Sequence, residues 1–389
     1  MRPANLEALK TKLNCIVAAE KQTSSIKFAN SVLFPHEIKS NNTIEGYIED
    51  LTMIEQVLSG SFSAIDKNQE QRIRNLFHGY AYILENRPIT KDNIKNLYKI
   101  LSEGLLKPSD AHRMGEYYRR EQVYILENGR EDIDYDGPEY VERLTLAGDI
   151  QRIQKQYRGF EPEDVSPALD QYLEFVNAPN IMGDAGKSLS IETPGDEFIK
   201  TQIMHFYFIH IHPYYDVNSR TSRTIAMWHL LNRKQYPFII FNRGINFAHR
   251  KYDTVRKDVI RYADLTYFLN YMMQAVLKEL EKEHVMNIAS QLVKGEFSQA
   301  EYQALLYFLT MKGTKTAIDI CKFYKNFNSH IARTQIYETM IDPLIERGIF
   351  DIERYTKGSL FNNQPNMVLT LSKKITSEIN PELTEDISI

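Results

Sequence analysis

The sequence predicts a mainly α-helical protein with one β-hairpin and a small C-terminal module of three helices and a second hairpin. Apolar residues recur at steps of three and four along most of the 389 residues, which is the period of an amphipathic helix. Only residues 122–135 break this period, with short strand-like runs around Asn128-Gly129. Beyond residue 296, helical segments give way to two strand-like segments.

The composition indicates a folded, reduced, cytoplasmic protein. Hydrophobic residues make up 43% of the chain and charged residues 25%, which excludes a disordered chain. The net charge of −4 argues against a protein that binds nucleic acid over its whole surface, although one basic face is compatible with it. Two cysteines exclude a disulfide scaffold and a Cys-based zinc domain. No apolar run is long enough for a membrane span, and the start lacks the pattern of a signal peptide.

Helical stripes follow one another along the first three quarters of the chain. The first, through Ile44, Ile48 and Leu51, predicts one continuous helix from about Asn42. The most apolar one predicts a buried central helix, and Trp228, Met272 and Met273 in later stripes are expected in the core. The further stripes cover residues 73–84, 94–105, 141–153, 198–211, 224–231 and 265–280.

The hairpin is expected at Gln122–Leu126, with Ile133 and Tyr135 on the returning strand. Asn128-Gly129 suits a turn that needs positive φ. An isolated hairpin is marginally stable, so this one should pack on helices. The pattern alone leaves a surface loop as an equal alternative.

The C-terminal module has the element order of a winged helix-turn-helix domain. A polar stretch, residues 281–295, separates it from the preceding helices. The expected helices are residues 298–312, 316–324 and 329–347, of which the last stops at Gly348. The expected strands are residues 349–355 and 367–371.

The densest group of polar residues lies at residues 209–223, between two apolar helices. Pro213 should end the first helix near His212. Asp216, Asn218 and Ser219 are suitable turn or N-cap residues for the second helix, whose N-terminus can bind an anion.

These residue types together suggest transfer of a phosphate-bearing group. Arg220 and Arg223 are three residues apart, so their guanidinium groups can share a helical face and bind phosphate. His212 is a candidate base, and Asp216 is a candidate ligand of Mg²⁺. The plain alternatives are a packed or capping histidine and two solvated arginines.

A zinc site is the other alternative for this segment. His205, His210 and His212 lie close in the sequence, but no Glu or Cys falls at a familiar ligand spacing.

The stretch His212-Pro213-Tyr214-Tyr215-Asp216-Val217-Asn218-Ser219-Arg220-Thr221-Ser222-Arg223 resembles the signature of Fic-domain proteins, His-Pro-Phe-x-Asp/Glu-Gly-Asn-Gly-Arg-x-x-Arg. His205 lies seven residues upstream, where the family often has a histidine. Residues 115–119, Gly-Glu-Tyr-Tyr-Arg, are similar to the entry of the family's flap hairpin. Pro88-Ile89-Thr90 also resembles a segment found in the family. The resemblance covers roughly residues 40–280.

This resemblance implies a helical nucleotidyltransferase that moves AMP from Mg-ATP to a Ser, Thr or Tyr hydroxyl of a target protein. The flap around residues 123–126 would position the target chain by strand addition. The implied roles are proton acceptance by His212, Mg²⁺ binding by Asp216, phosphate binding by Asn218, Ser219, Arg220 and Arg223, and an adenine contact by Tyr252, for which surface packing is an equal alternative.

The signature departs from the family pattern at three positions. Val217 and Ser219 replace glycines, and Tyr214 replaces Phe. Glycines in phosphate-binding loops permit positive φ, which a β-branched residue disfavours. Val217 therefore implies either an ordinary φ at this position or a strained turn, and the nucleotide donor and the activity are open.

A second motif, residues 40–46 (Ser-Asn-Asn-Thr-Ile-Glu-Gly), resembles the inhibitory motif of Fic proteins. Glu45 would then pair with Arg223 and block the γ-phosphate. Asn41 occupies the Ser/Thr position of that motif and could cap the helix. The plain alternative places Glu45 in the first turn of a helix, where it complements the helix dipole.

The expected domains are residues 1–110 with the inhibitory helix, 111–285 as the Fic core and 296–376 as the winged helix. Residues 296–374 hold ten Lys or Arg against eight Asp or Glu, which is few cations for DNA binding. Protein docking or homodimer formation is preferred for this module. A DNA-binding regulator with a nucleotide-sensing core, and an enzyme that removes AMP, remain as alternative functions.

Overall fold

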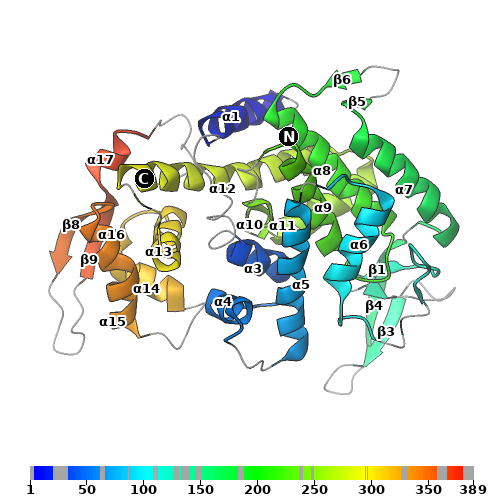
Figure 1. Cartoon of the computed structure of the whole chain (residues 1–389), viewed down its shortest axis with the longest axis horizontal. Coiled ribbons are helices and arrows are strands. Elements are labelled where there is room, and N and C mark those ends of the chain that lie inside the picture. The colour runs from blue at the N-terminus through cyan, green and yellow to red at the C-terminus, as the bar shows by residue number, and fades with distance from the viewer. Residues whose placement is uncertain are drawn as a thin grey trace.

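The computed structural model describes most of the chain and confirms a mainly helical protein (Figure 1). Among the helices that it describes, none is long and apolar enough to cross a membrane. The described residues are 4–20, 34–61, 66–85, 87–107, 110, 113–126, 131–132, 140–144, 150–158, 160–182, 188–235, 240–246, 249–293, 295, 297–325, 332–356 and 366–379.

Helices α8 (Pro194–Ile211) and α9 (Asn218–Asn232) form the centre of the molecule and confirm the predicted buried helix. Thr193 and Asp196 make a capping box that starts α8. Trp228, Met272 and Met273 are fully buried, as expected. The surrounding helices are α1 (Ala4–Glu20), α5 (Lys67–Leu84), α6 (Lys91–Ser102), α7 (Pro162–Asn177), α10 (Phe241–Asn246), α11 (His249–Tyr262) and α12 (Thr266–Leu292).

The helix predicted from Asn42 onward is wrong. Two helices, α3 (Phe34–Ile44) and α4 (Leu51–Ser59), replace it. The chain leaves α3 through Gly46, whose φ of 86° is the left-handed geometry that glycine favours at a helix C-terminus. Asp50 then starts α4 by accepting a hydrogen bond from the Met53 backbone N–H. A periodic stripe of apolar residues does not reveal such a break.

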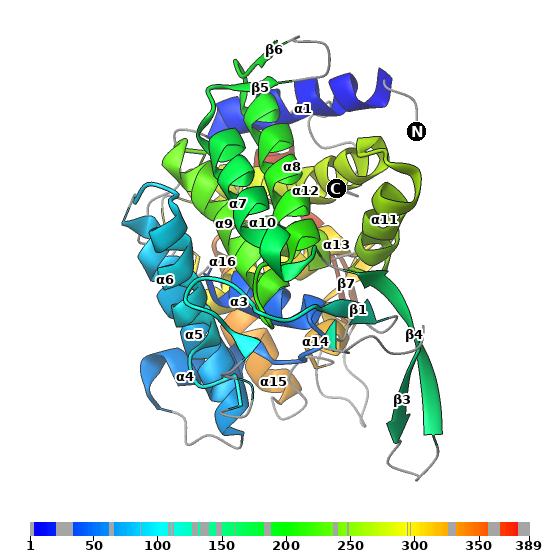
Figure 2. The same cartoon turned by 90° about the vertical axis from the view of Figure 1, so that its right-hand side faces the viewer.

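The single hairpin is part of a larger sheet, here called the flap sheet (Figure 2). A hairpin is present as β1 (Tyr124–Leu126) and β2 (Glu131–Asp132), whose strands pair antiparallel. The Asn128-Gly129 turn and the expected strand residues Ile133 and Tyr135 lie outside the described residues. Residues 141–153, predicted as a helix, form β3 (Tyr140–Leu144) and β4 (Ile150–Arg158) instead. The strand order is β2-β1-β4-β3, and a further two-stranded sheet joins β5 (Asn180–Met182) to β6 (Ser188–Ser190).

The C-terminal module, residues 299–376, contains the predicted sequence of elements. The three strands pair in the order β7-β9-β8. The helix that we expected as residues 329–347 is described from residue 333, and its middle is a π-helical turn. The elements are α13 (Gln299–Thr310), β7 (Lys315–Thr316), α14 (Ala317–Lys325), α15 (Arg333–Ile336), η5 (Tyr337–Ile341), α16 (Asp342–Glu346), β8 (Phe350–Thr356), β9 (Asn366–Leu371) and α17 (Lys373–Thr376).

The polar stretch that we expected to separate this module from the core is largely helical. Helix α12 continues through it to Leu292, and its charged residues are buried rather than solvated. Glu281 pairs with Lys12 of α1 at 2.7 Å, and Glu283 pairs with Arg243 of α10 at 2.6 Å. Partners that are distant in the sequence thus make this polar segment part of the packed interior.

Candidate active site

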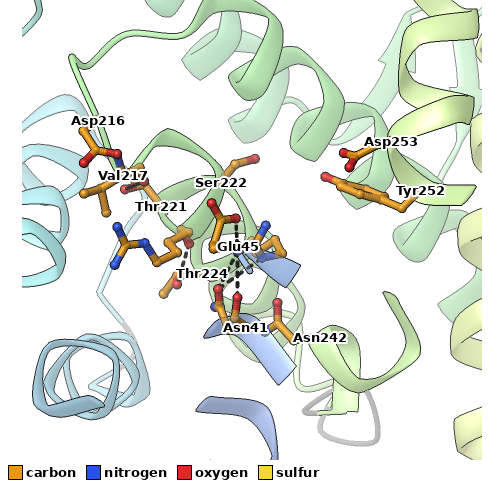
Figure 3. A network of polar contacts seen from close by, with 12 residues as sticks. Asn41, Glu45, Asp216, Val217, Thr221, Ser222, Thr224, Asn242, Tyr252 and Asp253 are labelled. Atoms are coloured by element: carbon orange, nitrogen blue, oxygen red, sulfur yellow. Dashed lines mark hydrogen bonds and ion pairs between the residues drawn. The ribbon is translucent and has the colours of Figure 1, made fainter. Parts of the chain in front are cut away.

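The predicted turn between two buried helices is confirmed, and it is here called the signature turn (residues 212–217). His212 ends α8 with a φ of 54°, and Val217 precedes α9 with a φ of 65°. Both ends of the turn therefore have left-handed backbone. Val217 and Asp216 lie at the start of α9 in Figure 3.

The imidazole of His212 is fixed in one tautomer. His212 is buried, and its Nδ1 lies 3.2 Å from the backbone oxygen of Ile209. Because a carbonyl oxygen can only accept, Nδ1 carries the proton. The lone pair of the neutral ring is then on Nε2, which is the form that a general base requires.

Arg119 clamps the signature turn, and the sequence analysis missed this role. Its Nε donates to the backbone oxygen of His212 at 2.7 Å, and its backbone N–H donates to Pro213 at 2.9 Å. The guanidinium also donates to the backbone oxygens of Glu121 and Phe160. The sequence signal was present, since Arg119 closes the Gly115–Arg119 motif, but only the fold shows what it holds.

Asn218 closes the signature turn with both ends of its side-chain amide. Its Oδ1 accepts from the backbone N–H of Tyr214 at 2.9 Å, and its Nδ2 donates to the backbone oxygen of Tyr214 at 2.7 Å. The N-cap role expected for Asp216, Asn218 and Ser219 is wrong, because Val217 is the N-cap and no side chain caps the helix. The turn role is confirmed for Asp216 and Asn218, whose side chains bond backbone groups of the turn. Asn218 therefore shapes the turn here, and its expected contact with phosphate stays a prediction.

Asn218→Ala is expected to destabilise the protein by about 2–4 kcal/mol, because two buried backbone groups of Tyr214 lose their partners. Urea denaturation of the full chain measures this free energy. Ser219→Ala is the matched control at the next, partly exposed position and should change little. Equal effects of the two substitutions would contradict the role of Asn218 in closing the signature turn.

The sequence left open whether Val217 has an ordinary φ or lies in a strained turn. The structure shows a positive φ at this β-branched residue. Left-handed backbone costs an L-residue roughly 1–2 kcal/mol. The Val217 side chain is buried, so its packing opposes this strain. The turn thus adopts the left-handed geometry that glycine favours without having a glycine at this position.

Val217→Gly and Val217→Ala both remove the buried side chain, but only glycine relieves the strain. We expect the glycine variant to be the more stable of the two by about 1 kcal/mol, which reverses the usual order of these residues. Chemical denaturation of both variants gives the comparison. A more stable alanine variant would show that the backbone at residue 217 is unstrained.

Arg223 is fully buried and binds the end of α3. Its Nη2 lies 2.6 Å from Oε1 of Glu45, in an ion pair, and 2.6 Å from Oδ1 of Asn41, while its Nε donates to the same Asn41 oxygen at 3.2 Å. Figure 3 shows Glu45 and Asn41 next to each other on this segment. The predicted contact between Glu45 and Arg223 is present, whereas Asn41 lies inside α3 and caps nothing.

Glu45 lies just after the C-terminus of α3, not in the first turn of a helix as the plain alternative proposed. The helix dipole disfavours a carboxylate at this end. Burial acts in the same direction, yet Arg223 and then Arg220 outweigh it and lower the pKa of Glu45. The carboxylate is therefore ionised at neutral pH, and the arginines hold it there.

Two buried guanidinium atoms of the signature have no hydrogen-bond partner among the described residues. They are Nε of Arg220 and Nη1 of Arg223. Buried polar groups are normally satisfied, because an unsatisfied one costs about 1–3 kcal/mol. These two arginine nitrogens lack a hydrogen-bond acceptor and belong to the helix that begins at the signature turn. They therefore indicate a binding site for an anion.

Asp216 is a partly exposed residue at the end of the turn. Its Oδ1 accepts from the backbone N–H of Val217 at 2.5 Å. In the described part of the chain, no three His, Cys, Asp or Glu side chains gather where they could hold a metal ion. A single carboxylate with a partly exposed side is still adequate for Mg²⁺, which takes its other ligands from water and substrate phosphates.

His205 and Tyr252 belong to a buried polar chain. Ser222 Oγ donates to the backbone oxygen of His205, so it accepts from His205 Nδ1 at 2.8 Å. Nε2 of His205 then accepts from the hydroxyl of Tyr252 at 2.8 Å. Burial, aided by Arg223 and Arg256, lowers the pKa of His205 far below its usual range, which keeps the ring neutral. The expected adenine contact of Tyr252 stays a prediction, since its ring is almost fully buried.

The flap sheet does not offer the edge that we expected. Tyr124 and Ile125 of β1 pair with β2 on one side and with β4 on the other. Strand addition to these two residues is therefore wrong. The outer strands β2 and β3 carry the sheet's edges.

Comparison with known proteins bears on the part of the chain that holds this site. Residues 88–230 match the model of the Fic/DOC family. No protein with a curated description matches the sequence.

Two solved structures are similar in fold. One is a Fic family protein from Desulfovibrio desulfuricans G20, with a TM-score of 0.51 and 15% identity over 95% of this chain and 97% of that one. The other is Fic-1 (residues 134–508) from C. elegans, with a TM-score of 0.50 and 13% identity over 74% of each chain. The match to the family model covers the signature turn, both arginines and Arg119, and the chain therefore contains a Fic domain.

Proposed function

We propose that the Fic domain transfers AMP from Mg-ATP to a hydroxyl group of a target protein. Fic proteins generally transfer a nucleoside monophosphate to proteins, which supports this reaction class. The observation that carries the proposal is the pair of orphaned, buried donors on Arg220 and Arg223. These groups need an anion, and a polyphosphate beside the N-terminus of α9 would supply it.

In the proposed reaction, Nε2 of His212 accepts the proton of the target hydroxyl. The hydroxyl oxygen attacks the α-phosphorus of ATP, and pyrophosphate leaves. Arg119 keeps His212 in position through its backbone oxygen, and Asn218 keeps the turn closed. Arg220 and Arg223 neutralise the phosphates, which is the main source of catalysis in phosphate transfer.

Asp216 would hold Mg²⁺ together with the phosphates of ATP. When bound, the ion neutralises the phosphate charge that develops on the leaving group. The partly exposed Asp216 at the end of the turn suits this role, because an ion shared with a substrate needs access from one side.

We also propose that Glu45 inhibits this reaction. Its carboxylate accepts the hydrogen bond of Arg223 Nη2, a group that would otherwise bind the γ-phosphate. Asn41 holds the same nitrogen, so α3 competes with the nucleotide through two side chains. A buried ion pair is weak evidence for stability and a better candidate for a switch.

The experiment supplies ATP labelled on either the α-phosphate or the γ-phosphate to the full chain and a lysate. Label on protein from the α position and not from the γ position supports nucleotidyl transfer. Label from the γ position alone would replace the proposal with a kinase reaction. The enzyme proposal would be overturned if the Glu45→Gln variant also transferred neither label.

For the C-terminal module we propose a winged helix that docks protein rather than DNA. The order helix, strand, helix, helix, strand, strand supports the assignment. The exposed residues of the helix at 333–346 include Thr334, Gln335 and Glu338, and a carboxylate on this face disfavours contact with phosphates. A salt-dependent, sequence-selective gel shift would contradict this assignment.

A further inference from the structure

The hydroxyl group of Tyr80 lies where three helices meet. Tyr80 is a fully buried residue of α5. Its hydroxyl accepts a hydrogen bond from Nδ2 of Asn41 on α3 at 3.2 Å and one from Nδ2 of Asn242 on α10 at 3.3 Å. Figure 3 shows these two asparagines next to each other. The hydroxyl is therefore bonded directly to a side chain that binds Arg223.

The hydroxyl of Tyr80 is neutral. Burial, followed by the charge of the Glu37 carboxylate, raises the pKa of Tyr80 far above its usual range. The ring packs against Phe34 of α3, with 5.3 Å between the ring centroids. Phenylalanine would keep this packing and lack only the oxygen, so Tyr80→Phe removes the two hydrogen bonds selectively.

The contacts of Asn41 fix the orientation of its side-chain amide. Oδ1 accepts from Nη2 of Arg223 at 2.6 Å and from Nε at 3.2 Å. A guanidinium group can only donate, so the oxygen of the amide must face Arg223. The amide nitrogen is then directed to Tyr80, whose hydroxyl is its acceptor. Asn41 thus has one compatible orientation, and the hydroxyl of Tyr80 completes it.

The same part of α3 is bound by α10 one turn earlier. The carboxylate of Glu37 accepts from the backbone N–H groups of Asn242 and Arg243, at 2.7 and 3.0 Å. Because the side chain of Asn242 also donates to Tyr80, α5 and α10 are joined to each other where they bind α3. Asn41 therefore belongs to a connected set of buried hydrogen bonds, and such a set favours one arrangement of its members.

Loss of the hydroxyl would weaken the contact between Asn41 and Arg223. Without it, Nδ2 of Asn41 is buried and has no acceptor in the observed arrangement, which is unfavourable. Turning the amide over gives no relief, because its N–H groups would then face the N–H groups of Arg223. The cost ends only when Asn41 leaves Arg223 and reaches water, so the substitution favours an open arginine.

We propose that Tyr80 is a positioning residue of the inhibitory contact: its hydroxyl orients Asn41, and through Asn41 it keeps Arg223 closed to the γ-phosphate. The orientation of Asn41 is independent of the reaction. The regulatory part rests on the proposed function, because it treats Arg223 as a phosphate-binding group and α3 as its inhibitor.

Urea denaturation of the full chain tests the bond between Tyr80 and Asn41. The four proteins compared are the unaltered chain, Tyr80→Phe, Asn41→Ala and the double variant. We expect Tyr80→Phe to destabilise the chain less when residue 41 is already alanine, because the bond between them can be lost only once. Strictly additive effects would overturn the whole inference.

The regulatory part is measured as the rate at which label from α-labelled ATP is incorporated into protein. We expect Tyr80→Phe to raise this rate about tenfold, since one buried donor without an acceptor shifts a two-state equilibrium by about that factor. The substitution should add little to Asn41→Ala. An effect of full size in the Asn41→Ala background would show that Tyr80 acts through the packing of α5, and it would overturn the proposal.

Tyr82→Phe is the matched control. Tyr82 is on the same helix, and its hydroxyl donates to Oδ1 of Asn93 on α6 at 3.1 Å. The substitution therefore removes a hydrogen-bonded hydroxyl from α5 at a residue that has no hydrogen bond to α3 in the described structure. We expect the rate of the unaltered chain. A rise equal to that of Tyr80→Phe would ascribe the effect to a general loosening of α5 and would contradict the role of Asn41.

The affinity for ATP, measured by isothermal titration, separates a failure of this inference from a failure of the proposed function. Tyr80→Phe should bind ATP about tenfold more tightly than the unaltered chain, because Arg223 is open more often. Unchanged affinity, while Glu45→Gln binds ATP more tightly, would overturn the regulatory part alone. Tighter binding without transfer by any variant would overturn the proposed reaction and support the positioning role of Tyr80.

Discussion

Glu45→Gln is expected to raise the rate of AMP transfer about tenfold. A hydrogen bond between charged groups contributes about 1.5–3 kcal/mol, against about 0.5–1.5 kcal/mol for one with a neutral partner. The difference is close to 1.4 kcal/mol, which is a factor of ten in the fraction of molecules whose Arg223 is open to the γ-phosphate. Glu45→Gly removes the contact of 2.6 Å completely and should raise the rate further. The measurement is label incorporated per minute from α-labelled ATP.

Glu49→Gln is the matched control for this variant. Glu49 lies four residues further on, is buried, and accepts a hydrogen bond from Asn42 at 2.6 Å, which glutamine can also accept. It has no contact with Arg223 in the described structure. We expect the rate of this variant to equal that of the unaltered chain. If both substitutions raise the rate equally, loosening of the segment explains the effect, and the specific role of Glu45 is wrong.

His212→Asn in the Glu45→Gln background is expected to lower transfer by about 10²–10⁴-fold, the usual contribution of a general base. Asparagine tolerates the left-handed backbone of residue 212, so the substitution removes the base without adding the strain that alanine would bring. The binding of ATP should be unchanged, because the arginines remain. The rate of transfer and the affinity for ATP are therefore measured together.

His210→Asn controls for the loss of an imidazole near the turn. His210 is two residues upstream, where its ring stacks on Phe206 and meets the edge-on ring of Phe160. We expect it to transfer AMP at the rate of its Glu45→Gln parent. A large loss in this control, or an active His212→Asn enzyme, would remove His212 from the proposed mechanism.

Much of the site was predictable because its signals are local. The apolar stripe of residues 198–211 marks α8, and Pro213 ends it within one residue of the predicted position. The contact between Glu45 and Arg223 spans 178 residues, yet two short motifs predicted it. A motif of this kind carries information that periodicity alone does not contain.

The wrong predictions share a physical cause. The spacing of residues in the sequence does not show which distant segments will pair with them in the fold. Residues 141–153 fit a helical stripe, but β1 pairs with β4 and draws the segment into a sheet. The polar residues from 281 onward suggested a boundary between the core and the C-terminal module, because the pattern could not show that Lys12 and Tyr302 would bury and pair Glu281 and Glu283. The role of Arg119 was missed for the same reason, since two of its side-chain acceptors lie 41 and 93 residues away.

The sequence by itself determined the helical class, the position of the signature turn and which groups we propose to bind phosphate. These depend on neighbouring residues, through helical period, proline and a motif of fixed spacing. Only the tertiary structure decided that Val217 adopts positive φ, that Asn218 closes the turn, and that α3 brings Asn41 and Glu45 onto Arg223. These features arise where packing between distant segments outweighs the preference of a single residue.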